Sequence, residues 1–76
     1  MIDAIFFEGT KDIHHDRVDE DLLYERFCRA QPIHLNGHGQ SYLISGLVRK
    51  EIHPKIWVLE VCVRTSTTWR DSRRYA

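Results

Sequence analysis

The sequence contains few cysteines, prolines and glycines, the residues that characterise many specialised small proteins. Its 76 residues include two cysteines, two prolines and four glycines. No apolar run approaches the roughly 20 residues of a membrane span, and the first residues carry an early acid, Asp3, with too short an apolar stretch for a signal peptide. Two cysteines do not make the disulfide framework of a small secreted domain. We therefore expect a cytoplasmic protein with no membrane partner, in which Cys28 and Cys62 are reduced core thiols.

Signatures of common chemistry are also missing. There is no glycine-rich phosphate loop, no nucleotide fingerprint and no paired-carboxylate motif. His34 and His38, with Cys28 before them, resemble a fragment of a zinc ligand set, but they straddle a glycine-containing turn and no second cysteine stands close by. A nucleophilic pair such as Cys62 and His53 would need a proximity that the sequence does not show. We predict no catalytic residue, no metal site and no cofactor, with solvated or capping histidines.

A chain of 76 residues is long enough for only one small domain, which we expect to span residues 1–76. A chain this short buries only about 60% of the surface that it exposes when unfolded. A deep substrate pocket is hard to build from so little chain. Functional sites should therefore be shallow, lie on an edge, or be completed by a partner.

The apolar pattern predicts an α+β fold. Residues 2–7 and 56–64 are β-prone, and apolar side chains on both faces of the second stretch indicate a central strand. Residues 10–15 are expected to form a connection or an early helical turn, followed by a helix with Asp16 as its N-cap that ends near Ala30. A third strand is predicted over residues 40–50, with Gly46 as a bulge. The turns fall at residues 36–39 and 53–55. The prediction is β-α-(β)-β-β: one helix on a three- to four-stranded, mostly antiparallel sheet.

Charge is divided unevenly along the chain, although its formal net value is zero. Residues 1–28 hold eight acids and three bases, whereas residues 29–76 hold eight bases and three acids. Such asymmetry often accompanies contact with nucleic acid or with a charged protein surface. Attraction between the opposite halves of two copies would give a salt-sensitive homodimer.

The basic half ends in residues 66–76, a tail rich in arginine and aromatic residues. Guanidinium groups hold phosphate in a bidentate fork, and aromatic faces stack on bases. Basic residues near the turn between the last two strands would extend this surface if the turn lies near the tail. The predicted nucleic-acid or partner-binding residues are Arg49, Lys50, Arg64, Trp69, Arg70, Arg73, Arg74 and Tyr75.

The last 20 or so residues also resemble the small ribonuclease toxins of toxin–antitoxin pairs. The resemblance rests on a Val-x-Val-Arg strand, Val61 to Arg64, followed by the Arg-Asp-x-Arg-Arg-Tyr ending of residues 70–75. It implies metal-independent RNA cleavage in which Arg64, Arg73 or Tyr75 lies near the scissile phosphate. The chain departs from that family in its short length and its single expected helix.

Three functions remain open from the sequence. The first is a non-enzymatic inhibitor or adaptor, of the kind common among mobile-element proteins, whose basic half engages a nucleic acid or a nucleoprotein complex. The second is a protein-only interaction domain that binds a host protein or a second copy of itself. The third is the metal-independent ribonuclease.

Overall fold

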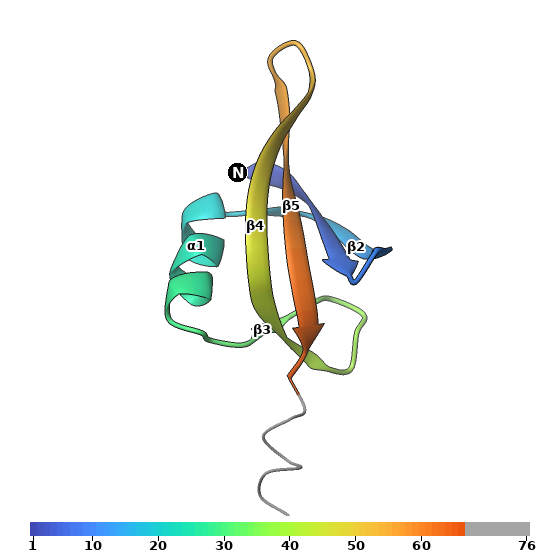
Figure 1. Ribbon diagram of the computed structural model, residues 1–76, viewed down its shortest axis with the longest axis vertical. Coiled ribbons are helices and arrows are strands. Elements are labelled where there is room, and N and C mark those ends of the chain that lie inside the picture. Colours follow the sequence, from blue (N-terminus) through green and yellow to red (C-terminus); the bar gives the residue numbers. More distant parts are fainter. Residues whose placement is uncertain (67–76) are drawn as a thin grey trace, which may run out of the picture.

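A computed structural model describes residues 1–66 of the chain. The elements are β1 (Ile2–Glu8), β2 (Lys11–Val18), α1 (Glu20–Cys28), β3 (Ile33–His34), β4 (Ser41–His53) and β5 (Ile56–Thr65). The strands form one curled sheet in the order β2-β1-β5-β4-β3 (Figure 1). β1 and β5 run parallel, and the other neighbouring pairs are antiparallel. The α+β prediction with one helix and a mostly antiparallel sheet is confirmed, but the sheet has five strands, not three or four.

β2 is a strand that the sequence did not predict. It folds back on β1 through a two-residue turn at Gly9 and Thr10, where Gly9 adopts a φ of +66° that favours glycine. The pairing sets Ile2 opposite Val18 and ends with Glu8 opposite Lys11. Residues 10–15 are therefore not a simple connection.

The helix consequently begins later than expected. Asp19, not Asp16, is the N-cap, and its Oδ1 accepts a hydrogen bond of 3.0 Å from the backbone N–H of Asp21. Asp16 lies within β2, so its prediction as the cap is wrong. After the helix, Ala30 takes a left-handed φ of 53° and turns the chain toward Pro32 and β3.

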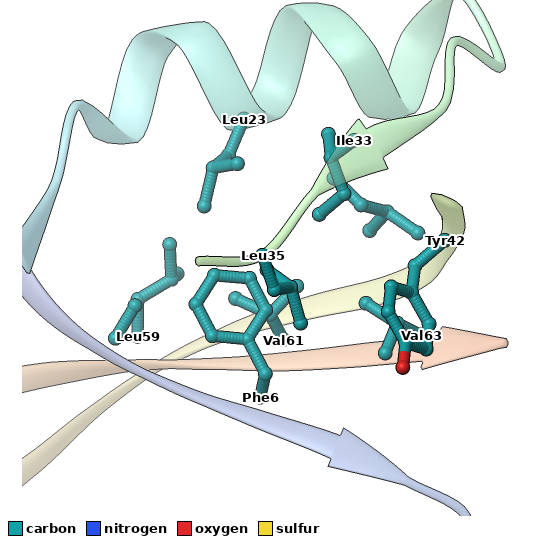
Figure 2. Close-up of a cluster of buried hydrophobic side chains, with 10 residues drawn as sticks. Phe6, Leu23, Ile33, Leu35, Tyr42, Leu59, Val61 and Val63 are labelled. Atoms are coloured by element: carbon teal, nitrogen blue, oxygen red, sulfur yellow. The ribbon is translucent and has the colours of Figure 1, made fainter. Parts of the chain in front are cut away.

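The core lies between the inner face of the curled sheet, which includes Ile33 of its edge strand β3, and the layer formed by α1 and Leu35 (Figure 2). The largest fully buried side chains are Phe6 of β1 with Leu59 and Val61 of β5. Leu23 is the buried residue of α1. β5 is the middle strand of the sheet, which confirms its prediction as a central strand.

The β4–β5 hairpin is longer than the sheet that supports it. The predicted bulge is confirmed, because the β4–β5 register shifts between Ile44 and Gly46. The predicted reversal at residues 53–55 is also confirmed, with Lys55 at a positive φ of 68°. The end of the hairpin that carries the turn reaches beyond the start of β1 and projects from the body (Figure 1). This projection contributes to overall extents of 52 × 23 × 19 Å.

Both cysteines lie at the surface. Cys28 occupies the last turn of α1 and Cys62 the outer face of β5, and both thiols are free and exposed. Their prediction as core thiols is wrong, since the side of each element that carries the cysteine faces away from the core. Within residues 1–66, no helix has the length and apolar character needed to cross a membrane.

Candidate functional site

The projecting part of the hairpin, residues 48–57, is here called the arm. It holds four of the eight large hydrophobic side chains that are exposed within residues 1–66: Val48, Ile52, Ile56 and Trp57. Their exposed fractions are 54%, 51%, 50% and 43%. They are uncovered because β1 pairs with β5 only from Val58 onward, so the arm extends beyond the strands that flank it. Val48 lies on the outer face of the sheet and Trp57 on the inner face beside Arg49, so both faces of the arm carry exposed apolar surface. Concentration of such side chains on one projecting element marks an interaction site more often than scattered exposure does.

Arg49 and Trp57 form a stacked pair at the base of the arm. The guanidinium carbon of Arg49 lies 5.3 Å from the centre of the Trp57 ring, within the range of a cation–π contact. Arg49 Nε is also 3.3 Å from Glu20 Oε2 in the first turn of α1. The two contacts hold Arg49 between the arm and the helix, so its charge is already balanced within the chain.

A shallow hollow of about 510 Å³ opens between the arm, the start of β1 and the start of α1. Trp57 and Ile56 provide apolar wall, and charged side chains of both signs surround them. The acids are Asp3, Asp19, Glu20 and Asp21, and the bases are Arg17, Arg49 and Lys55. Four carboxylates against three cations make this hollow a poor seat for a phosphate backbone, which is bound by neutralising cations.

The structure separates the predicted basic residues that it describes. Arg49 pairs with Glu20 of the helix, whereas Lys50, the next residue along the strand, lies 3.8 Å from Glu60. Successive strand residues point to opposite faces, so Arg49 and Lys50 do not share a surface. Arg64 is six residues along β5 from Val58, the register partner of Lys50, which is roughly 20 Å at the usual rise per residue.

The turn at residues 54–55 lies at the opposite end of β5 from Arg64 and Ser66. The expected continuation of a basic stripe from this turn toward the C-terminal end of β5 is therefore not formed by residues 1–66. The remaining predicted site residues, Trp69, Arg70, Arg73, Arg74 and Tyr75, lie outside the described residues.

A cluster of rings that the sequence did not indicate links β2 to the loop after β3. The His14 ring lies 5.6 Å from Phe6 and 5.2 Å, edge to face, from His38. Tyr42 Oη is 3.4 Å from His38 Nδ1. His14 and His38 are half-buried, so the prediction of solvated or capping histidines is wrong for this pair. The cluster packs the loop against the edge of the sheet that β2 forms.

The candidate catalytic and metal-binding groups are not brought together in the described part of the chain. His53 pairs with Ile56 at the tip of the hairpin, whereas Cys62 pairs with Gly46 six residues further along β5. Within residues 1–66, no group of three or more histidine, cysteine or acidic side chains is arranged to hold a metal ion. The arm and its adjoining hollow are thus the most distinctive surface of residues 1–66.

Comparison of the chain with protein-family models, with curated proteins and with solved structures finds no match.

Proposed function

We propose that this chain is a non-enzymatic binding protein, an inhibitor or adaptor, that docks on a partner protein through the arm. The observation that carries the proposal is the concentration of exposed Val48, Ile52, Ile56 and Trp57 on one projecting hairpin. A two-stranded hairpin is marginally stable by itself in water. A contact that covers these side chains would stabilise the arm and the complex together.

The composition of the arm resembles that of energetically important interface residues. Trp and Arg are enriched among the few residues that dominate binding energy, and such residues are usually surrounded by a polar rim. Trp57 stacked on Arg49 supplies this pair, and the charged edge of the hollow supplies the rim. The pair is also preorganised, because Glu20 holds Arg49 in place.

The charge of the hollow favours a protein over a nucleic acid at this site. Carboxylates outnumber cations around it, and Arg49 already has Glu20 as an acidic neighbour within the chain. Nucleic-acid affinity depends on cations that are free to displace counterions from phosphates. A protein surface with both signs of charge suits the hollow better.

The test is an affinity capture from nuclease-treated lysate with the wild-type full chain and two variants of it. Wild type should retain a stoichiometric protein, and Trp57→Ala should weaken its retention at least about tenfold, as truncation of a dominant interface residue does. Leu22→Ala is the matched control, because Leu22 is similarly exposed at 47% but lies on α1. Equal retention by Trp57→Ala and Leu22→Ala would refute docking through the arm.

Sequence composition supports a second candidate, engagement of nucleic acid by the C-terminal basic segment. Residues 64–76 contain four arginines, one tryptophan and one tyrosine against one acid. The triple variant Arg70→Ala, Arg73→Ala and Arg74→Ala should then lose nucleic acid that wild type retains after washing, while circular dichroism shows an unchanged fold. Binding by wild type should fall steeply as salt is raised. Full retention by the folded triple variant would exclude this candidate.

A further inference from the structure

The outer edge of β4 has an unpaired backbone over most of its length. β3 pairs with Ser41 and Tyr42, and within residues 1–66 no strand lies beside residues 43–53 on the side away from β5. A row of unpaired N–H and C=O groups is a template for another strand. The edge therefore offers backbone hydrogen bonds in addition to the side chains of the arm.

Access to this edge is greatest in its distal half. α1 contacts β4, and Glu20 at the start of the helix reaches Arg49. Residues 48–53 are all exposed, and Figure 1 shows this part of the hairpin extending past the helix. The accessible template is thus residues 48–53, with regular alternation over residues 48–51 and a register shift at Ile52, between Glu51 and His53.

We propose that the partner contributes an extended strand that pairs with β4 over residues 48–53. This inference rests on the proposed function and specifies how the partner is bound. Val48 and Lys50 lie two residues apart and share the outer face of the sheet. Lys50 lies 3.8 Å from Glu60, but its side chain is 60% exposed and so is accessible to a second carboxylate. The added strand accordingly carries an apolar side chain beside Val48, an acidic one beside Lys50, and no proline where its N–H must donate. Backbone pairing supplies affinity and the alternate side chains supply specificity.

A second copy of this chain fits the edge less well than a foreign strand does. A symmetric antiparallel pair places one residue opposite its own copy. Centring the pair on Arg49, Lys50 or Glu51 sets like charges directly opposite each other, which is destabilising. Centring it on Val48 runs the second strand along residues 43–47 toward β3, which already occupies the edge at Ser41 and Tyr42. Centring it on Ile52 soon meets Pro54, which has no N–H to donate.

The experiment uses random seven-residue peptides displayed on phage and selected on the immobilised full chain. The tightest peptide is then resynthesised with each backbone N–H methylated in turn. We expect methylation at every second position to weaken binding about tenfold, since each removes one hydrogen bond to β4. Methylation at the positions between them should be tolerated, because those N–H groups point away from β4. Bound peptide should also slow hydrogen exchange at residues 48–53.

A matched variant tests the side-chain part of the proposal. Selection on Lys50→Glu should replace the acidic preference of the peptides at one position with a basic preference. Selection on Leu22→Ala, altered on the exposed face of α1, should leave the peptide sequences unchanged.

Each other outcome overturns strand pairing. Failure to select any peptide does so, as does an N-methyl scan without a two-residue period. If peptides bind without that period but lose affinity for Trp57→Ala, the arm docks through side chains, and the proposed function stands while this inference fails. Protection of residues 48–53 that grows with protein concentration alone assigns the edge to a second copy.

Discussion

At the scale of single residues, side chains that look alike in sequence have opposite surroundings. Trp57, Leu59, Val61 and Val63 alternate along β5 and therefore point to the same face of the sheet. Leu59, Val61 and Val63 are buried, whereas Trp57 is 43% exposed. The difference arises because β1 begins to pair with β5 at Val58, so the core ends before Trp57.

Substitution of Leu59 tests whether the buried residues of β5 stabilise the fold. We expect Leu59→Ala to lower the unfolding free energy by about 2–5 kcal/mol, because it removes transfer energy and leaves a cavity. Val48→Ala, on the exposed arm, should change it by less than about 0.5 kcal/mol. Urea denaturation of both variants measures the difference. Similar losses for the two would mean that the arm is packed in solution.

Asp19 tests the position of the helix start. Asp19→Ala should lower the unfolding free energy by about 1 kcal/mol, because the backbone N–H of Asp21 loses its acceptor. Asp19→Asn keeps a side-chain oxygen at the cap and should be nearly neutral. Urea denaturation again provides the measurement, and an equal loss for both variants would point to charge instead of capping.

At the scale of elements, the strands rich in apolar residues were predictable and the polar edge strand was not. β1 and β5 carry the β-prone apolar pattern of strands that pack on the core. β2 contains Ile13 and Val18 as its aliphatic residues, and a register shift opposite Phe6 and Phe7 interrupts its alternation. Its identity as a strand depends on pairing with β1, which is a tertiary contact and leaves little trace in local sequence.

The candidate site was predictable only in part for the same reason. Arg49 and Lys50 were predicted as binding residues, and they do lie on the hairpin that forms the arm. Their separation onto two faces follows from strand geometry, but the acidic neighbours Glu20 and Glu60 follow from packing. Exposure of the arm depends on where β1 and α1 begin, and the periodicity of the sequence does not show this.

The tight reversal of the hairpin makes a prediction at this scale. Lys55 has a φ of 68°, a conformation that costs a residue with a Cβ roughly 1 kcal/mol. Lys55→Gly should therefore raise the unfolding free energy by up to about 1 kcal/mol relative to Lys55→Ala, which removes the same charge but keeps the Cβ. Thermal denaturation of both variants decides the point, and a less stable glycine variant would contradict it.

At the scale of the whole molecule, the division of charge along the sequence is not a division in space. β5 comes from the basic half of the chain but lies next to β1 from the acidic half. Ion pairs join the halves as well, since Glu20 lies 3.3 Å from Arg49 and Glu25 lies 3.5 Å from Arg29. Two acids of the first half are therefore matched by bases of the second half inside one copy.

This interleaving argues against a homodimer held by opposite charges. We expect sedimentation velocity to show a monomer at about 0.01 M salt, where charges act over roughly 30 Å, and also at about 1 M, where they act over roughly 3 Å. The Arg49→Ala variant, which leaves Glu20 without its partner, is the sensitised control and should also stay monomeric. A dimer at low salt that dissociates at high salt would show that opposite charges bind between copies, because screening weakens exposed ion pairs but leaves apolar contacts intact.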